Sequence, residues 1–512
     1  MKLKINYSLW ILIGLTGFLA ACGGSSGGNA VTDPGNNNGG NNGGNNGGNN
    51  GGGGATGDVT INFQNIAVHD PSVIKVDDSY YVFGSHLSAA KTNDLMNWQR
   101  VADGVNVANP LFDNVTTELA ETFAWAETDT LWATDVIQLG DGKFYMYYNA
   151  CRGDSPLSAM GIAIADNIEG PYQDAGIFLR SGNKASNGEP GYIHPQYNAN
   201  IHPNVVDPHV FYDDAGLLWM MYGSYSGGIF ILAMDPDTGF PYSDQGYGKH
   251  IIGGNHSRIE AAYVLYSPES EYYYLFTSFG GLDASGAYNI RVARSLSPDG
   301  PYVDAEGNDV AEVKSNPSLP LFDDATIAPG AVKLMGNFQF AGGAGYVSPG
   351  HNSAYYDAQL DKHLIFFHTR FPGRGEQHEV RVHEMAINTE GWPVIAPHRY
   401  VPLSEAPETL PEAITEAEVT GSYQLINHNK DISAAIKPSV SISLEDTGLI
   451  SGAVSGSWFY AEDNMITLVV DGLGTFKGKT MRLWSTADKD FVVTFSAVSE
   501  GGVALWGSRS AD

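Results

Sequence analysis

Cysteine is almost absent from this chain, which has two in 512 residues, Cys22 and Cys151. Cys22 ends the segment Leu19-Ala20-Ala21-Cys22, after a basic start and an apolar run. This layout predicts a bacterial lipoprotein signal peptide over residues 1–22, with Cys22 as the acylated residue. The alternative is an ordinary signal peptide that contains a cysteine by chance. With Cys22 used for lipid attachment, no disulfide framework is expected in the mature protein.

Positive charge is also scarce. Lysine and arginine number 27 against 57 aspartates and glutamates, which gives a formal net charge of -30 and a pI near 4.6. Such a field repels nucleic acid and acidic membrane surfaces and disfavours an anionic polymer as substrate, whereas a neutral ligand meets no repulsion. Long apolar runs are missing after the leader, so the N-terminal lipid anchor is the only membrane contact expected. Amphipathic helical windows are nearly absent, which excludes a parallel α/β fold.

Composition divides the rest of the chain. Residues 23–57 are nearly all Gly, Asn and Ser, and they predict a flexible tether with a span of roughly 30–35 Å. Residues 58–407 contain short strand-type runs and frequent turn signals. Residues 408–418 predict a linker, and residues 419–512 alternate in a way that predicts a small β-barrel or sandwich. Gly23, after the lipid-bearing cysteine, is compatible with the outer membrane of a Gram-negative cell, so we expect a cell-envelope location.

One pattern occurs five times, and each copy begins on an ionisable residue. The copies are DPSVIKVDDSYYVFGS from Asp70, DVIQLGDGKFYMYYNA from Asp135, DPHVFYDDAGLLWMMYGS from Asp207, EAAYVLYSPESEYYYLFTSFGG from Glu260 and HNSAYYDAQLDKHLIFFHTR from His351. Each is an alternating strand, a turn and a second strand rich in aromatic residues, and a third strand follows in GIAIADNIEGPY from Gly161. Repeats of about four strands at intervals of roughly 50–90 residues predict blades. The expected fold is therefore all-β, a five-bladed β-propeller followed by the small barrel or sandwich.

Four of the repeat openings are acids, and three of them, Asp70, Asp207 and Glu260, are the candidates for chemistry. If the copies are arranged radially, these side chains converge on one axis. Glycoside cleavage needs two carboxyl groups, one held protonated as the acid and one kept ionised, and a third acid nearby raises the pKa of the donor. A single Asp-Pro at the start of a strand is usually only a turn cap. Acids at matched inward positions of three repeats are better explained by a shared function.

The surrounding residues make the hypothesis more specific. The motifs are HDPSVIKVDDSYYVFGSH, LWATDVIQLGDGKFYMYYNAC, NVVDPHVFYDDAGLLWMMYGSYSGGIFIL, GGNHSRIEAAYVLY, SFGGLDASGAYNIRVARS, SPGHNSAYYD and FFHTRFPGRGEQHEVRVHEM. They resemble glycoside hydrolase family 43, and within it the two-domain bacterial endo-α-1,5-L-arabinanases, from about Val59 onward. The resemblance implies a five-bladed propeller that hydrolyses with inversion. It also implies that Asp70 is the general base, Glu260 the general acid and Asp207 the residue that tunes and orients the acid.

Further residue roles are implied by the same resemblance. His351 matches a histidine beside a calcium ion that is held largely by water in the propeller cavity. On chemistry alone a lone histidine is a weak calcium signal, because calcium prefers oxygen ligands, and a histidine bonded inside the channel is the alternative. Substrate contacts are implied for two of the acids and five other residues: Asp70, Gly153, Asn204, Asp207, Ser224, Tyr225 and Ser226. Trp132 has two possible roles, stacking on a sugar or core packing.

Two features fit the resemblance less well. Asp135 opens the second repeat, yet no chemical role is evident for it. Ala261 and Ala262 follow Glu260, where the family often has proline or glycine then proline; this departure removes no chemical group.

Three functions remain open at this point. The leading hypothesis is a monomeric endo-arabinanase that acts on neutral arabinan. The second is an exo-α-L-arabinofuranosidase or β-xylosidase on the same fold, because sequence does not show the length of the groove. The third is a non-catalytic glycan-binding surface lipoprotein, which would not need a proton donor.

Overall fold

The computed structural model describes residues 60–182 and 197–510. The expected signal peptide, the tether and the lipidation site Cys22 lie outside the described residues. Within these two ranges, no helix is both long and apolar enough to cross a membrane.

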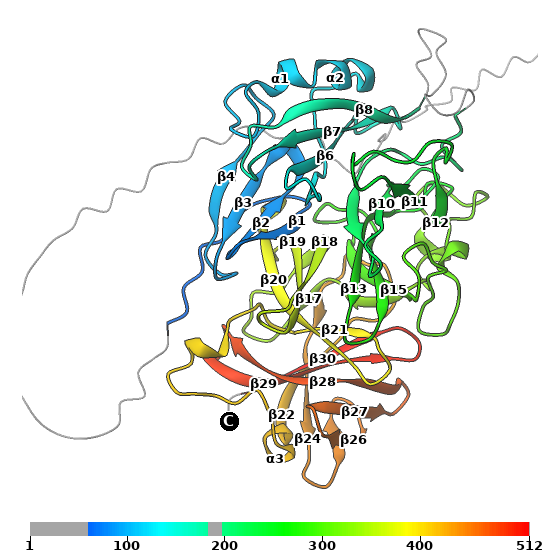
Figure 1. The fold of residues 1–512 in the computed structure, drawn as a ribbon. Helices are drawn as coiled ribbons and strands as arrows, with labels where there is room; N and C mark the ends of the chain where they lie inside the picture. The colour runs from blue at the N-terminus through cyan, green and yellow to red at the C-terminus, as the bar shows by residue number, and fades with distance from the viewer. Residues whose placement is uncertain (1–59, 183–196, 511–512) are drawn as a thin grey trace, which may run out of the picture.

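The upper body in Figure 1 consists of five four-stranded antiparallel sheets. The first two sheets are β1 (Ser72–Val76), β2 (Ser79–Phe83), β3 (Ala89–Thr92) and β4 (Gln99–Ala102), then β5 (Asp135–Gln138), β6 (Phe144–Cys151), β7 (Ser158–Ala165) and β8 (Gln173–Ser181). The third and fourth are β9 (His209–Tyr212), β10 (Leu218–Tyr222), β11 (Ile229–Met234) and β12 (Lys249–Ile252), then β13 (Ile259–Ser267), β14 (Tyr272–Phe279), β15 (Asn289–Ser295) and β16 (Val332–Met335). The fifth is β18 (Val347–Asp357), β19 (Lys362–Arg370), β20 (His378–Ile387) and β21 (Pro393–Ile395).

These sheets form a closed ring. The first strand of each sheet contacts the first strand of the next, in the order β1, β5, β9, β13 and β18, and β18 returns to β1. The ring is also closed near the N-terminus, where the N–H of Val380 donates to the carbonyl of Ile66. The predicted five-bladed propeller is therefore confirmed. Because the repeats open on the inner strands, their first residues are brought to the central axis.

Turn residues define the hairpins between the first two strands of each blade. Val76 pairs with Ser79, so the first hairpin has a two-residue turn of Asp77 and Asp78. Asp77 has φ 53°, in the left-handed region that aspartate tolerates better than most residues. Gly216 has φ 80° in the corresponding turn of the third blade. These are the Asp- and Gly-containing turns that the repeats predicted.

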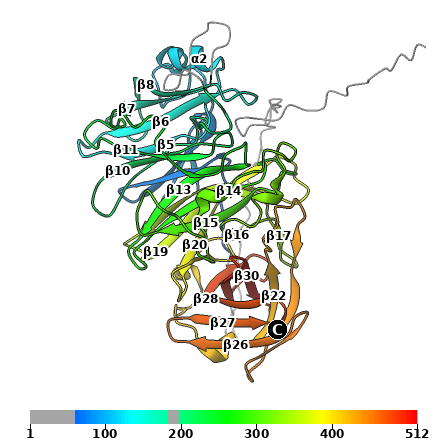
Figure 2. The same ribbon diagram turned by 90° about the vertical axis from the view of Figure 1, so that its right-hand side faces the viewer.

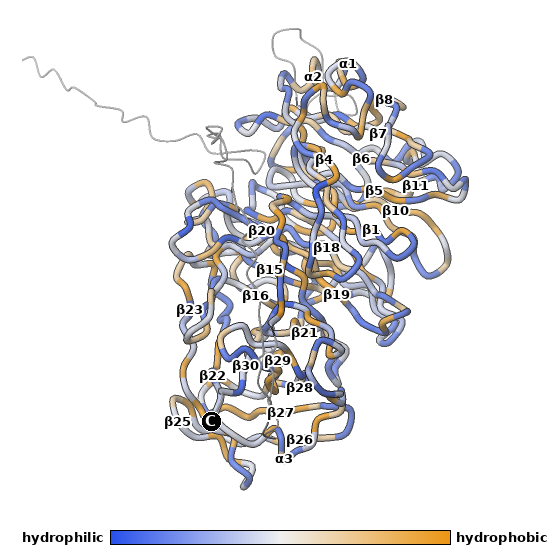
Figure 3. The backbone as a smooth tube through the Cα atoms, turned by 90° about the vertical axis from the view of Figure 1, so that its left-hand side faces the viewer, coloured by the Kyte–Doolittle hydropathy of each residue, from blue (hydrophilic) through white to orange (hydrophobic). Residues whose placement is uncertain are grey.

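The core lies mainly between neighbouring blades. Tyr81 and Phe83 of β2 cluster with Met146 and Tyr148 of β6, and each later pair of blades has a cluster of the same kind. The aromatic second strand of each repeat supplies much of this packing. Figure 3 accordingly shows hydrophobic segments spread through both halves of the molecule.

The C-terminal part is a closed barrel below the propeller in Figures 1 and 2. Its strands are β22 (Gly421–Asn427), β24 (Val440–Leu444), β25 (Leu449–Gly452), β26 (Gly456–Ala461), β27 (Met465–Val470), β28 (Gly474–Ser485), β29 (Asp490–Ser499) and β30 (Ala504–Arg509). The barrel alternative of the prediction is therefore confirmed. The described helices are short: α1 (Val115–Glu118), α2 (Ala120–Ala126), α3 (Glu416–Val419), and the 3-10 turns η1 (Ser85–Leu87), η2 (Val310–Glu312), η3 (Asp324–Thr326) and η4 (Leu403–Glu405).

The propeller and the barrel share an extensive interface. β17 (Phe338–Gln339) pairs in parallel with β23 (Lys437–Pro438). The ring of Phe338 lies 5.1 Å from that of Trp506 on β30. The buried guanidinium of Arg291 donates to the carbonyl of Lys430 at 2.8 Å. Apolar packing and charge-assisted hydrogen bonds thus join the barrel to the fourth and fifth blades.

Cys151, at the end of β6, is fully buried. Cys22, the other cysteine of the chain, lies outside the described residues, so the expectation about disulfides stays a prediction.

Candidate active site

The openings of the five inner strands surround one small cavity on the propeller axis. Asp70 and Asp207 precede β1 and β9 by two residues, and His351 lies in β18. These three line a cavity of about 20 Å³, together with Ala261, which follows Glu260 in β13. The structure therefore brings together the three acids and the histidine that the repeats singled out.

The backbone at these openings is strained. Asp70, Asp207, Ala261 and His351 have φ values of 58°, 54°, 59° and 44°. Non-glycine residues seldom occupy this left-handed region, and such strain persists only where the surrounding structure enforces it. Its repetition at matched positions of four blades marks this site as the functional centre. Ala261 is one of the two alanines in which the chain departs from the family pattern.

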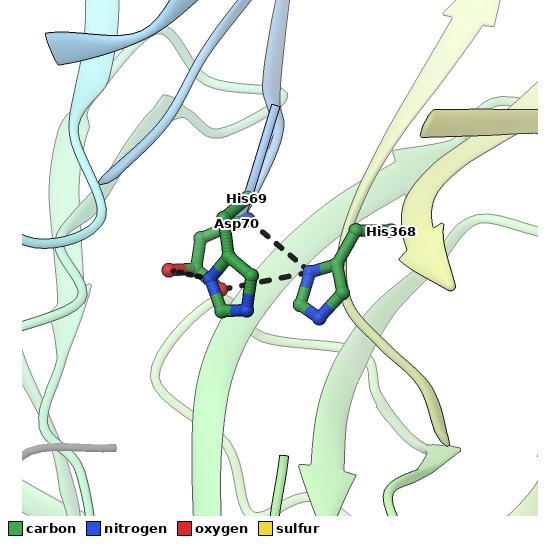
Figure 4. Close-up of side chains that lie close together, drawn as sticks. All are labelled: His69, Asp70 and His368. Carbon is green, nitrogen blue, oxygen red and sulfur yellow. Dashed lines mark hydrogen bonds and ion pairs between the residues drawn. The ribbon is translucent and has the colours of Figure 1, made fainter. Parts of the chain in front are cut away.

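Asp70 is held by three histidines and a serine. Its Oδ1 lies 2.9 Å from Nδ1 of His351, and its Oδ2 lies 2.8 Å from Nδ1 of His69. The hydroxyl of Ser85 donates to the same Oδ2. The backbone N–H of Asp70 donates to Nδ1 of His368 at 3.2 Å (Figure 4). The contacts of His351, His69 and Ser85 hold the carboxylate in one orientation, and the contact with His368 holds the backbone of Asp70.

The environment of Asp70 favours its ionised form. Burial raises the pKa of this carboxyl, but the charges of His351 and His69 and their hydrogen bonds outweigh burial and place the pKa well below its usual value. A carboxylate that stays ionised can accept a proton from water. Asp70 thus has the electrostatics of a general base.

His69, Asp70 and His368 also present ligand atoms within 4.8 Å of one another, as a metal site would (Figure 4). Hydrogen bonds account for this cluster without a metal. The Asp70 N–H points at the Nδ1 lone pair of His368, and His69 Nδ1 is already at hydrogen-bond distance from the carboxylate. A metal here would have to displace both contacts, so the geometry favours a support for Asp70.

Glu260 has a different environment. Ser224 donates to its Oε2 at 2.7 Å, and the phenol of Tyr288 donates to its Oε1 at 2.8 Å. Burial raises its pKa, the charge of His351 and these two hydrogen bonds lower it, and the charge of Asp70 raises it, with a net increase. The protonated form is therefore favoured more than in an exposed glutamate, as a proton donor requires.

Asp207 is the third buried acid. Its Oδ2 accepts the backbone N–H of Ala261 at 3.3 Å, which connects it to the strand that carries Glu260. Burial raises its pKa, the charge of His351 lowers it, and the charges of Glu260 and Asp70 raise it, to about 8. Asp207 and Glu260 thus share one buried environment in which two negative charges are costly.

Asp135 has a structural role. Its carboxylate accepts the hydroxyl of Ser72 in the first blade and the backbone N–H of Val210 in the third, the latter at 2.6 Å. It therefore joins the inner strands of the two blades beside its own. This role explains why the second blade also opens on an acid that faces the axis, although that acid takes no part in the chemistry.

The predicted sugar contacts differ in exposure. Asn204 is fully buried and accepts the hydroxyl of Ser158, and the side chain of Ser226 is also fully buried. Tyr225 is 5% exposed and donates to the carbonyl of Gly280 at 3.4 Å. Ser224 acts on Glu260, as described above. For Asn204, Ser226 and Tyr225, direct contact with a sugar stays a prediction.

Two other candidates lie nearer to the surface. Gly153 is partly exposed in the loop that follows β6. Trp132 is partly buried; its indole N–H donates to the carbonyl of Cys151 at 2.6 Å, and its ring lies 5.2 Å from that of the exposed His86. Packing and stacking on a ligand are therefore both compatible with its position.

Several site residues had no recognisable signal in the sequence. His69 adjoins Asp70, and its position beside a candidate base was the only available hint. Tyr288 directly precedes β15 of the fourth blade, 28 positions from Glu260, and His368 lies in β19 of the fifth blade, 298 positions from Asp70. Only the packing of the blades places these side chains at the axis.

The residues near His351 show whether this site has the chemistry to hold calcium. Its Nδ1 pairs with Asp70, and its backbone N–H donates to Ser278 at 2.8 Å, which leaves Nε2 as the remaining ring nitrogen. Next to it, Asn352 lines the axial cavity and is 2% exposed, yet neither atom of its amide has a partner among the described residues. An unsatisfied buried amide oxygen close to carboxylates suits a hard cation or its bound water. The residues present fit calcium.

Family comparisons agree with this architecture. The family model described as "Glycosyl hydrolases family 43" matches residues 62–324, and the model described as "C-terminal lipocalin-like domain" matches residues 397–507. The first match contains all three acids, and the second contains the barrel strands except the last two residues of β30.

Similar proteins share the whole arrangement. Extracellular endo-α-(1→5)-L-arabinanase 2 of Bacillus subtilis (strain 168) is 55% identical over 453 residues, which are 87% of this chain and 94% of that protein. A solved family 43 glycoside hydrolase from Bacillus licheniformis has a TM-score of 0.84 at 58% identity, covering 88% of this chain and all of that one. The solved endo-1,5-α-L-arabinanase of Thermotoga petrophila RKU-1 has a TM-score of 0.83 at 47% identity, covering 88% and 99%.

Proposed function

The chain belongs to glycosyl hydrolases family 43, and from this premise we propose that it is an endo-acting arabinanase that hydrolyses α-1,5-L-arabinofuranosidic bonds with inversion. The observation that carries the proposal is that the pKa values of two buried carboxyls are shifted in opposite directions. The surroundings of Asp70 lower its pKa, and those of Glu260 raise its pKa. A base and an acid at one site are what a single-displacement hydrolysis needs.

In the proposed mechanism Asp70 removes a proton from water as the water attacks the anomeric carbon. Glu260 donates its proton to the leaving glycosidic oxygen, with Ser224 and Tyr288 orienting the carboxyl group. Asp207 holds the backbone beside Glu260 through the Ala261 N–H, and because two negative charges are costly in their shared buried environment, a proton is retained on the Asp207–Glu260 pair. The two catalytic carboxyls of an inverting enzyme lie about 6.5–9.5 Å apart, which leaves room for the water.

Three observations favour this function. A glycan-binding lipoprotein would need neither an ionised base nor a protonated acid, and burying three acids without a function is costly. The similar proteins of high coverage are named endo-arabinanases, which supports endo over exo cleavage. The substrate, a neutral polysaccharide, also meets no repulsion from a chain of net charge -30.

Product analysis on linear arabinan tests the endo assignment. We expect a ladder of short arabino-oligosaccharides in the first minutes, with a rapid fall in viscosity, because internal bonds are cut. Arabinose as the sole early product would overturn endo action in favour of the exo alternative. Absence of any cleavage by a folded preparation would support the non-catalytic alternative.

We further propose one calcium ion in the propeller cavity, held by Nε2 of His351 and by water, with the Asn352 amide oxygen bonded to the ion or to one of its waters. Binding through Nε2 needs the neutral imidazole, so the bound ion would replace the positive charge of His351 beside the carboxylates. We expect calcium titration to show one site, and free calcium at about one hundred times Kd to stabilise the protein by about 2.7 kcal/mol.

Titration calorimetry and thermal unfolding, on protein dialysed against a chelator, measure this effect. His351→Ala is expected to abolish the calcium-dependent shift in Tm, while magnesium should not replace calcium. An unchanged shift in His351→Ala, or no binding to the chelator-treated wild type, would rule out this site.

We propose that the protein is anchored at the cell surface through lipid on Cys22 and acts as a monomer. Detergent partitioning and intact mass of the mature chain, before and after reduction, test the anchor. With two cysteines in the chain, lipid on Cys22 and a disulfide within one chain exclude each other. A mass without acyl groups, or membrane association retained in Cys22→Ser, would contradict the proposal.

A further inference from the structure

A second cavity lies between the propeller and the barrel, and none of its lining residues takes part in the proposed chemistry. Its volume is about 240 Å³. That is below the roughly 300–1,000 Å³ of pockets for drug-sized ligands and suits a ligand about the size of one sugar ring. Domain interfaces are preferred places for such sites. The position of the cavity therefore makes it a candidate binding site separate from the axis.

Aromatic side chains form part of its wall. Phe340, Tyr346 and Phe371 line it from the propeller, and Trp484 lines it from the end of β28 in the barrel. Phe340 also packs against the ring of His398 at 5.4 Å. Flat apolar faces of this kind pack against the apolar face of a sugar ring.

Three arginines also line the cavity, against one acid. They are Arg381 of β20, Arg399 after β21 and Arg509 of β30, and the acid is Asp488. Asp488 accepts the hydroxyl of Ser485 at 2.6 Å. This concentration of positive charge is unusual in a chain with 27 basic and 57 acidic residues.

Arg399 is the arginine whose charge is least compensated. Its Nη1 donates to the amide oxygen of Asn65 at 3.0 Å, and its guanidinium carbon lies 3.6 Å over the ring of Phe63. It makes no salt bridge with any acid in residues 60–182 and 197–510, whereas Arg381 pairs with Glu379 at 2.6 Å. Burial and the charge of Arg381 lower the pKa of Arg399 to about 9. A carboxylate bound here would relieve the desolvated charge.

Polar groups at the cavity can bind sugar hydroxyls. His398 Nε2 and the Ser508 hydroxyl are 2.8 Å apart, and Gln424 lies nearby on β22. The overall negative charge of the protein does not exclude an anion here. Charges more than about 8 Å away are largely screened at physiological ionic strength, so the nearby arginines dominate.

We propose that this cavity binds a carboxylate-bearing sugar, with the carboxylate at the Arg399 guanidinium and the ring against the aromatic wall. The site is independent of arabinan cleavage and would let the enzyme hold an acidic glycan unit while the axis acts on a neutral chain. One internal competitor exists, because residues 511–512 follow Ser510, which lines the cavity, and end in an aspartate.

Calorimetry with the full chain and D-galacturonate as the probe tests the proposal. We expect saturable binding, and at least tenfold weaker binding of D-galactose, which has the same ring without the carboxylate. Arg399→Gln should weaken galacturonate binding at least tenfold, and Arg399→Lys less, because lysine keeps the charge but loses the planar fork. Arg100→Gln is the matched control; it removes the same charge from an exposed residue of β4 in the first blade, outside the cavity, and should bind as wild type does.

Each contrary result would overturn the proposal. These results are galacturonate binding that does not saturate in the wild type, binding no tighter than that of galactose, or binding to Arg399→Gln as tight as to the wild type. Inorganic phosphate binding as tightly as galacturonate would show a simple anion site without sugar recognition. Binding only after deletion of residues 511–512 would show that the chain's own carboxylates are the occupant. If Arg399→Gln does not fold, Arg399→Lys replaces it, and galacturonate binding to Arg399→Lys as tight as to the wild type would overturn the proposal.

Discussion

Replacing Glu260 with glutamine is expected to lower kcat on linear arabinan by about 10²–10⁴-fold, the usual contribution of a positioned proton donor. Glutamine keeps the size of the side chain, and the hydroxyls of Ser224 and Tyr288 can rotate to pair with its amide. The loss should therefore be chemical rather than structural. It is measured as initial rates of reducing-end release.

The leaving group shows whether proton donation is what Glu260→Gln loses. In an arabino-oligosaccharide that carries a 2,4-dinitrophenyl group, the dinitrophenolate can leave without being protonated. The variant should therefore regain most of its rate on that substrate. The wild type should lose activity as pH rises through the raised pKa of Glu260, because the protonated form is the active one. Glu271→Gln, an exposed change on the same hairpin, should leave both rates unaltered. A variant equally slow on both substrates would remove Glu260 from the role of acid.

Asp70→Asn is expected to cause a loss of similar size, about 10²–10⁴-fold, on arabinan and on the activated substrate alike. A base is needed to activate water whatever the leaving group, so an easier departure does not restore the rate. Asparagine also cannot accept at both positions where His351 and His69 now donate to the carboxylate. The contrast between the two variants assigns base and acid.

The control for Asp70→Asn is Asp78→Asn, which makes the same change in the exposed turn between β1 and β2. Unfolding temperatures of both variants show whether any loss comes from the fold. Recovery of Asp70→Asn on the activated substrate would mean that Asp70 is not the base. A wild-type rate on arabinan would mean that it has no part in the reaction.

Much of the architecture could be predicted from local patterns. The hairpins follow from alternating strands and from turns such as Asp77–Asp78, whose conformation depends on neighbouring residues alone. Five similar copies then required a repeating architecture, because one hairpin pair cannot bury its aromatic strand alone. The three acids were found for the same reason, since a repeat marks which position faces the axis.

The support of the site could not be predicted in this way. Asp70 and His368 are 298 positions apart in the chain, and Tyr288 reaches Glu260 from the residue before β15 in the same blade. Asp135 was recognised as an inward acid, but its role depends on Ser72 and Val210, which belong to two other blades. The cavity with Arg399 combines propeller and barrel residues that share no motif.

The sequence by itself determined the repeat, the all-β fold, the family and the three acids, because each of these depends on residues close together in the chain. Only the tertiary structure decided the opposite pKa shifts of Asp70 and Glu260, the structural role of Asp135 and the arginine cavity. Proton affinity depends on burial and on charges within a few ångströms, and closure of the ring brings those charges together from distant parts of the chain.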